Sequence, residues 1–196
     1  MRHLLLYLFA SISLLSCGAG SSNASSGEKT DLSGYETTDN GNITKAVKKD
    51  NTGVIIEEGY LTDGVKNGTW ITYHANKTIL KSLSSYIDGN LNGTHLEFSN
   101  RGQIETKISY NNNNYDGLYA TYKNGRPVKE MNYVNGELDG VMNEYDARGN
   151  LQKITNFKEG KPHGDMLFYD EEGTLMMEYK YDNGEKISGG IITKQE

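Results

Sequence analysis

Apolar and polar side chains alternate along short stretches of the chain from Gly53 onward. In residues 104–110, Ile, Thr, Ile and Tyr alternate with Glu, Lys and Ser, and residues 175–181 show the same period of two. This period places alternate side chains on opposite faces of a β-strand. Asn-Gly and Asp-Gly pairs bound such stretches and supply the positive φ angles that tight hairpin turns require. The pattern predicts short strands joined by tight turns.

Turn glycines recur at a nearly constant interval, which indicates an internal repeat. Successive members are separated by 25, 24, 23 and 24 residues. They are Gly68, Gly93, Gly117, Gly140 and Gly164. Each unit is predicted to be a β-hairpin, and isolated hairpins are marginally stable, so neighbouring units must stabilise one another. About six tandem units over residues 52–192 predict an all-β fold, an elongated single antiparallel meander of about eleven or twelve strands.

Two columns of side chains recur within the units. Two residues after the turn glycine stand Trp70, His95, Tyr119, Met142 and Met166. Five residues after it stand Tyr73, Phe98, Tyr122, Tyr145 and Tyr169. Offsets of two and five place the columns on opposite faces of a regular strand. Either the second column forms a structural aromatic ladder that replaces a core, with the first half-packed beside it, or the first column is an exposed protein-binding strip.

The N-terminus has the pattern of a lipoprotein signal. Arg2 precedes an apolar stretch, residues 4–15, that is shorter than the roughly 20 residues of a transmembrane helix. The sequence Leu14-Leu15-Ser16-Cys17-Gly18 resembles the bacterial lipobox. That resemblance implies removal of residues 1–16 as a signal peptide and lipidation of Cys17. The alternative is a free or buried cysteine beside an ordinary cleavage site, with no disulfide partner because the chain has one cysteine.

Residues 17–51 are rich in Ser, Gly, Asn and Thr. Such a segment buries too little apolar area to offset the entropy lost on ordering. We predict a lipidated, flexible tether, within which one degenerate hairpin could begin near Asp39-Asn40-Gly41.

Composition and histidine spacing argue against several classes of function. The chain carries 20 basic and 26 acidic side chains, a net charge of −6, which disfavours a nucleic-acid ligand. After the signal, His74, His95 and His163 stand in different units without a metal-ligand spacing. We therefore expect a protein that is not an enzyme and that has no cofactor, metal or small-molecule substrate.

The units share the skeleton Tyr-x-x-Gly-x-x-x-Gly-x-x-x-x-Tyr, which resembles the MORN-type repeat variant of the YwqK family of bacterial antitoxins and of small lipoproteins. The resemblance covers residues 53–189 and implies protein binding, with neutralisation of a toxin in the antitoxin branch. We expect a protein-binding lipoprotein anchored in the bacterial cell envelope, with the outer membrane preferred. The alternative is a structural envelope spacer or assembly protein.

Overall fold

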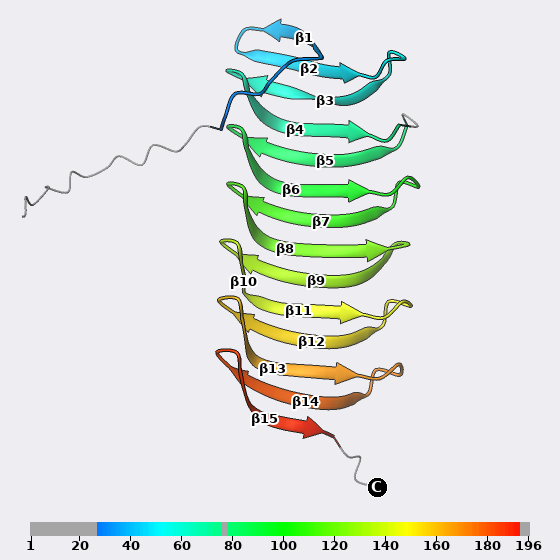
Figure 1. The fold of residues 1–196 in the computed structure, drawn as a ribbon, viewed down its shortest axis with the longest axis vertical. Helices are drawn as coiled ribbons and strands as arrows, with labels where there is room; N and C mark the ends of the chain where they lie inside the picture. The colour runs from blue at the N-terminus through cyan, green and yellow to red at the C-terminus, as the bar shows by residue number, and fades with distance from the viewer. Residues whose placement is uncertain (1–26, 76–77, 193–196) are drawn as a thin grey trace, which may run out of the picture.

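The computed structural model describes residues 27–75 and 78–192, which form one antiparallel β-sheet of 15 strands (Figure 1). The strands are β1 (Tyr35–Asn40), β2 (Ile43–Lys49), β3 (Ile55–Thr62), β4 (Val65–Tyr73), β5 (Leu80–Ile87), β6 (Asn90–Phe98), β7 (Ile104–Asn111), β8 (Asn114–Lys123), β9 (Arg126–Val134), β10 (Glu137–Leu138), β11 (Gly140–Tyr145), β12 (Leu151–Lys158), β13 (Lys161–Tyr169), β14 (Leu175–Asp182) and β15 (Glu185–Ile191). Strands pair in chain order, except that β10 pairs beside the path with β9. The predicted all-β meander is confirmed.

Tight turns close one edge of the sheet, and both central residues of each have positive φ angles. These turns are Asp63-Gly64, Asp88-Gly89, Asn112-Asn113, Asn135-Gly136, Glu159-Gly160 and Asn183-Gly184. Two consecutive positive φ angles are the signature of type I′ turns, whose twist matches that of the strands they join. These turns lie at one end of the strands, which we call the tip edge. The turns at the opposite end of the strands form what we call the outer-turn edge.

The five repeat glycines predicted as turns have a different role. All five have positive φ, from 75° at Gly68 to 103° at Gly140. They lie within strands or at the start of β11, and strand pairing shifts register around Gly68, Gly93, Gly117 and Gly164. The prediction of a tight turn at these positions was therefore wrong. A positive φ beside a register shift is typical of a β-bulge, which bends the strand sharply.

The main buried cluster lies on one face, which we call the inner face because the bent hairpin tips fold over it. Trp70, Ala46 and Leu61 form its most buried cluster, and Tyr86 and Tyr35 pack against it. The Trp70 indole N–H donates to the Tyr60 carbonyl at 2.9 Å. Since the described chain contains no second layer, the sheet buries its apolar residues under its own hairpin tips.

The segment predicted as a tether contains structure. Strands β1 and β2 pair with each other and continue onto β3, so the predicted boundary at residue 51 was wrong and the hairpin left open near Asp39 is present. Before β1, the Thr30 amide donates to Gly64 O at 3.0 Å and the Gly27 amide to Asp88 O at 2.7 Å. We call residues 27–33 the strap. Its Leu32 packs against the Trp70 cluster, which offsets the cost of ordering a polar segment.

The other N-terminal predictions, the signal peptide over residues 1–16 and lipidation of Cys17, lie outside the described residues.

Gly59 provides a test of how the core packs. A Cβ at Gly59 would overlap the indole ring of Trp70. We predict that Gly59→Val lowers the free energy of unfolding by about 1–3 kcal/mol because the indole is displaced. Urea unfolding followed by the fluorescence of Trp70, the single tryptophan of the sequence, measures the change.

The matched control is Gly190→Ala, because a Cβ there meets no heavy atom within 4 Å. Its effect on the free energy of unfolding should stay within about 0.5 kcal/mol. Equal unfolding midpoints for Gly59→Val and the wild-type protein would contradict the packing described.

Candidate functional site

The first predicted column runs along the inner face, where strand pairing links it through residues of the intervening strands. Trp70 pairs with Ser84, and Ser84 with His95. Trp70 is only 2% exposed, and the Lys66 ammonium lies 4.0 Å from its ring centroid. The interpretation of Trp70 as part of an exposed binding strip was therefore wrong. At Trp70, the bend at Gly68 brings the hairpin tip over this column, and Lys66 of that tip covers the indole.

Aromatic rings cover the middle of the same column. Tyr115, from the tip edge of β8, has its ring centroid 5.6 Å from Tyr119 and 5.2 Å from both Tyr110 and Tyr133. Burial raises the pKa of Tyr110 to about 12, followed in size by the effect of Tyr115. His95 makes an edge contact with Tyr110 at 6.3 Å. Tyr119 and His95 are thus core residues of the repeat.

A serine and a histidine meet in this column, a contact that the sequence analysis missed. Ser84 Oγ lies 2.8 Å from His95 Nδ1, and His95 Nε2 lies 3.7 Å from a Glu97 oxygen. A nucleophile and a base at such a distance can support covalent catalysis when a substrate can reach them. Ser84 is 8% exposed, and Tyr110 packs on the imidazole. The arrangement satisfies the hydrogen-bonding groups of a buried serine and a partly buried histidine.

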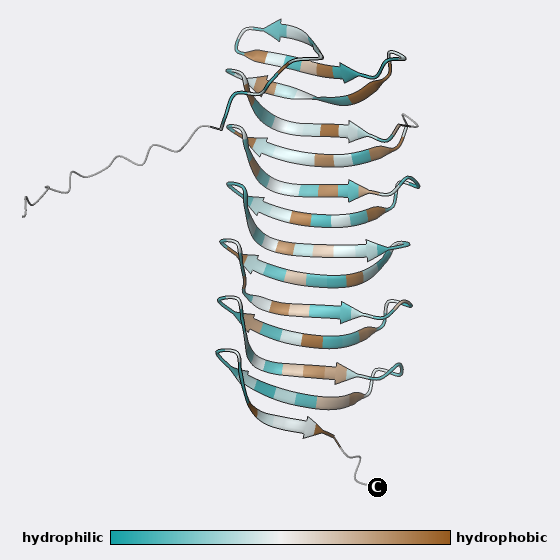
Figure 2. Ribbon diagram, viewed as in Figure 1, coloured by the Kyte–Doolittle hydropathy of each residue, from teal (hydrophilic) through white to brown (hydrophobic). Residues whose placement is uncertain are grey.

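Methionines gather in the C-terminal half of the inner face. All five methionines that follow Met1 lie between residues 131 and 177, and Met142 and Met166 of the predicted column are half-buried there, on either side of Thr155. Figure 2 shows hydrophobic positions recurring from strand to strand along the sheet, while the turns at both edges are mostly hydrophilic. The apolar side chains here are less covered than in the Trp70 cluster.

Beside these methionines lies an open hollow of about 580 Å³, which we call the Met hollow. Its lining includes Val128, Phe168, Met176 and Met177, together with Lys129, Glu144 and Lys153. Val128 and Met176 are about 40% exposed, so their apolar surface is available for contact. Thioether side chains adapt their shape to different partners.

An ion-pair triad forms the polar wall of the Met hollow. Glu144 accepts from Lys129 at 3.0 Å and from Lys153 at 3.2 Å. Burial raises the pKa of Glu144, but the hydrogen bonds and charges of the two lysines outweigh burial and leave that pKa below its ordinary value. Two lysines around one glutamate make this wall locally cationic in a protein whose net charge is −6.

The second predicted column lies on the opposite, outer face and is half-buried. None of its five members takes part in a ring pair among the described residues, so the prediction of a stacked ladder was wrong. Alternate strands are about 9.6 Å apart, beyond the 4.5–7 Å range of ring contacts. Instead, the Tyr73 hydroxyl donates to Glu58 at 2.8 Å and the Tyr145 hydroxyl to Glu130 at 2.7 Å.

The outer-turn edge carries a recurring polar turn, and the side chain that caps this turn was not predicted from the sequence. An Asp or Ser side chain accepts the amide hydrogens of residues two and four positions later. The four capping residues are Asp50, Ser99, Asp146 and Asp170, each followed three residues later by glycine. That spacing is the sequence signal that could have identified the motif.

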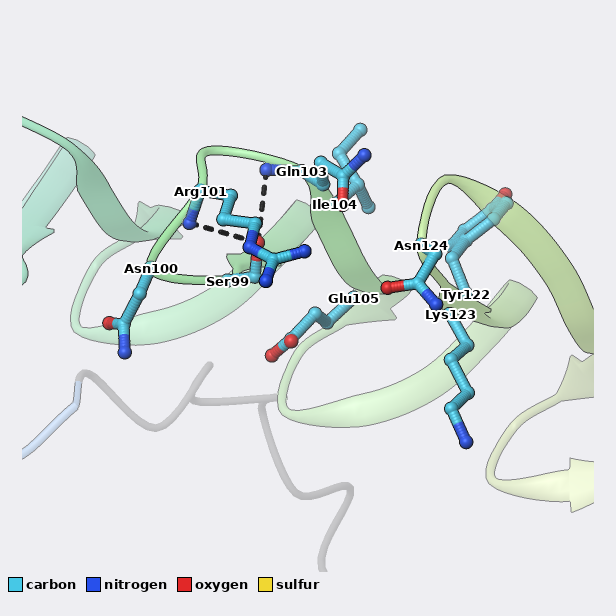
Figure 3. A pocket seen from close by; sticks show the side chains of 9 residues that line it. All are labelled: Ser99, Asn100, Arg101, Gln103, Ile104, Glu105, Tyr122, Lys123 and Asn124. Carbon is cyan, nitrogen blue, oxygen red and sulfur yellow. Dashed lines mark hydrogen bonds between the residues drawn. The ribbon is translucent and has the colours of Figure 1, made fainter.

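Ser99 illustrates this role in a polar hollow of about 370 Å³ at the outer-turn edge (Figure 3). Its hydroxyl oxygen accepts from the Arg101 and Gln103 amides, both at 3.2 Å. Arg101, Glu105 and Lys123 also line the hollow. Ser99 therefore stabilises the turn.

In residues 27–75 and 78–192 there is no cluster of three or more His, Cys, Asp or Glu side chains placed to hold a metal ion. The same residues include no helix of the length and apolar character needed to cross a membrane.

The tyrosine–glutamate pairs of the outer face predict a specific alkaline behaviour. Burial, and then the bond to Glu130, raises the pKa of Tyr145 to about 12. Because the unfolded-state pKa is near 10, this tyrosine contributes stability that is fully present below about pH 10 and lost as the pH rises towards 12. We predict that Tyr145→Phe loses less stability than wild type between pH 9 and 11.5 in urea unfolding followed by circular dichroism.

The control for this experiment is Phe98→Leu, which alters the equivalent outer-face ring without removing a hydroxyl. It should lower stability by a similar amount at each pH. A Tyr145→Phe curve parallel to that of the wild-type protein would contradict the prediction.

Sequence comparison agrees with the repeat architecture. Residues 91–112, 138–159 and 162–183 match the family described as MORN repeat variant. Each matched segment comprises the strands on either side of one outer turn: β6 with β7, β11 with β12, and β13 with β14. No curated protein sequence matches the chain at a significant level. These three segments thus match a MORN-type repeat, and such repeats are generally protein- or membrane-interaction repeats.

Proposed function

We propose that this protein is a non-catalytic, membrane-tethered binding protein that holds a protein partner on its inner face at the Met hollow. The observation that carries the proposal is the contrast along that face. Trp70 is covered by the tip edge, whereas Met176 of the Met hollow is 41% exposed. A large apolar hollow with a few polar groups at its wall is the usual form of a recognition site.

The chemistry of the Met hollow indicates the kind of partner. Phe168, Met176 and Met177 offer apolar contacts, and the lysines of the ion-pair triad lie beside them. A partner segment with an apolar side chain next to a carboxylate would fill the hollow and approach Lys129 or Lys153. Such a pairing combines an apolar anchor with complementary charge, which improves specificity and the association rate.

The membrane tether rests on the sequence around Cys17, and two or three acyl chains would give stable anchoring. The outer membrane is the preferred location. A narrower version of the proposal makes the partner a toxin and this protein its antitoxin or immunity protein. This version rests on the resemblance of the repeats to YwqK-type antitoxins.

One observation favours a structural alternative. The sheet path of 14 strands, at about 4.8 Å per strand, spans about 60–65 Å. A rod of that length on a lipid anchor could act as an envelope spacer or assembly subunit. The two functions differ in what they contact, because a spacer touches itself or the cell wall and a binder touches a different protein.

Crosslinking in intact cells tests the binding function. We predict that the wild-type protein gives one heterologous product and that Met176→Lys reduces it at least about fivefold, because a charge enters the apolar hollow. Capture from native membranes followed by mass spectrometry identifies the product. The matched control is Ile87→Lys, an exposed residue of the tip edge (53%), which should leave the product unchanged.

Two results would contradict binding at the Met hollow. A heterologous product unaffected by Met176→Lys would show that the partner binds elsewhere. Self-crosslinks or cell-wall products alone would support the spacer.

Anchoring is tested separately with Cys17→Ser. We expect the variant to move from the membrane fraction to the soluble fraction and to lose the mass of the attached acyl chains, because the thiol that carries the lipid is gone. Fractionation with mass spectrometry of the purified chain measures both changes. Unaltered membrane association together with an unmodified wild-type Cys17 would contradict the proposed anchor.

A further inference from the structure

The outer face carries a continuous row of residues that pair directly with one another across the sheet. The register links Glu58 on β3 to Glu178 on β14 through one residue of every strand between them on the sheet path. Directly opposed residues of neighbouring strands project from the same face of a sheet. We call these eleven residues, one from each strand of the path from β3 to β14, the outer row.

The outer row has a nearly symmetric order about its middle. The middle consists of Lys107, Ala120 and Glu130 on β7, β8 and β9. Outward from it stand Leu96, Leu83, Ile71 and Glu58 on one side, and Asn143, Ile154, Leu167 and Glu178 on the other. Counted from Ala120, a lysine matches a glutamate at the first position, and aliphatic residues match at the third and fourth. Of the two glutamates at the ends, Glu58 is paired with Lys45 at 3.4 Å.

A second row lies beside the outer row, toward the outer-turn edge, and consists of aromatic and apolar residues. In it the five rings of the second predicted column each pair with an apolar residue of the next strand, namely Leu80, Ile104, Pro127, Leu151 and Leu175. We call these ten residues the ring row. The rings lie on β8, on the strands two places away on either side, and on the strands four places away. They are therefore symmetric about β8, as the outer row is.

These two rows form a long apolar face without a second layer in the described chain. The strap and the hairpin tips lie over the inner face instead. Figure 1 shows the strands from β2 to β14 keeping a nearly common direction, and flat sheets of many strands are typically stabilised by stacking or by side-chain ladders. The rows extend over about 48 Å by roughly 15 Å, or about 700 Å². One partner of a stable complex buries roughly 800 Å².

We propose that the outer face is the interface of a homodimer, in which a second copy packs face to face across a two-fold axis parallel to β8 and next to Ala120. Such an axis places each position opposite the position equally far from β8 in the other copy. Lys107 then faces Glu130 of the second copy at two equivalent contacts, and rings face rings. The inference goes beyond the proposed function and does not depend on it.

Charge favours a second copy as the occupant. Lys107 is half-buried, and neither it nor Glu130 has an ion-pair partner among the described residues. Glu130 accepts only the Tyr145 hydroxyl, at 2.7 Å. Ala120 is fully buried between them by neighbouring side chains, so the two charged groups would make the contact at the centre. The dimer supplies each of them with an opposite charge.

The axis also suits a protein anchored at its N-terminus. Rotation about an axis parallel to the strands keeps the tip edges of both copies on the same side. The described strap begins at this edge, where the Gly27 amide bonds to Asp88 O. Both chains would therefore enter the dimer from one side, and the two inner faces would point away from each other.

Charge reversal tests the two-fold contact with the mature full-length protein in detergent. We expect the wild-type protein to dimerise at micromolar concentration in sedimentation velocity. Lys107→Glu and Glu130→Lys each place like charges opposite one another at both contacts, so each variant alone should dimerise at least about tenfold more weakly. An equimolar mixture of the two should recover the dimer, because every contact then joins a lysine to a glutamate.

Two further variants locate the interface. Leu83→Lys puts a charge into the apolar part of the outer row and should weaken the dimer at least about tenfold. Lys123→Glu is the matched control for charge reversal, because Lys123 is exposed on the same strand as Ala120 and alternation places it on the opposite face. It should dimerise as wild type does. Thermal unfolding of all variants checks that the fold is intact.

A wild-type protein that stays monomeric at about 100 μM would overturn the proposal. So would equal effects of Lys107→Glu and Lys123→Glu, or a mixture of the two charge variants that dimerises no better than either alone. A monomeric wild-type protein whose heterologous crosslink in cells is lost in Lys107→Glu would assign the outer face to a different protein. A dimer that persists in Met176→Lys, without any heterologous crosslink in the wild type, would support the dimer and remove the proposed function.

Discussion

The structure depends on the bend at the bulge glycines. A single β-sheet has two faces and no second layer, so its apolar side chains stay in water unless the chain returns over them. Positive φ angles at Gly68, Gly93 and their equivalents turn each hairpin tip onto the inner face. Residues with a Cβ rarely adopt these angles, which explains why glycine holds these positions in every unit. Each unit thereby builds a small core against its neighbours.

The hairpin tips cover the inner face more completely in its N-terminal half than toward the C-terminus. The covered part serves stability, and the more open part is the one that we propose for recognition. In the N-terminal half the strap, Tyr35 and Tyr86 surround Trp70, and the mid-sheet tyrosines contact one another. Toward the C-terminus, methionines replace the aromatic rings of the column, and the Met hollow stays open. Units that share one backbone can therefore differ in how much apolar surface they leave available.

Much of this architecture could be predicted from the sequence. Alternation, the turn pairs and the constant period predicted a meander of hairpins, because these signals are local and repeat many times. The 23-residue interval before Gly140 also has a local cause, since the two-residue turn at Asn124-Gly125 replaces the longer Asp- or Ser-capped turn of other units. The number of strands was underestimated because β1 and β2 are polar, and an edge pair needs few apolar residues.

The faces could not be assigned in the same way. Offsets of two and five placed Trp70 and Tyr73 on opposite sides, but strand parity does not tell which side the hairpin tips cover. That depends on the direction of the bend at Gly68, a tertiary property. The contact between Ser84 and His95 likewise follows from strand register, which a sequence with several equivalent alternations leaves open.

The strap has a mechanical consequence. Its amide hydrogens bond to the tips of two successive hairpins, at Gly64 and Asp88, before the chain enters β1. Tension applied to the chain at Gly27 would first load these two bonds and the Leu32 contact, and only afterwards the β1–β2 ladder. A molecule pulled from its N-terminal side would thus spread the force over the first three hairpins instead of peeling one edge strand.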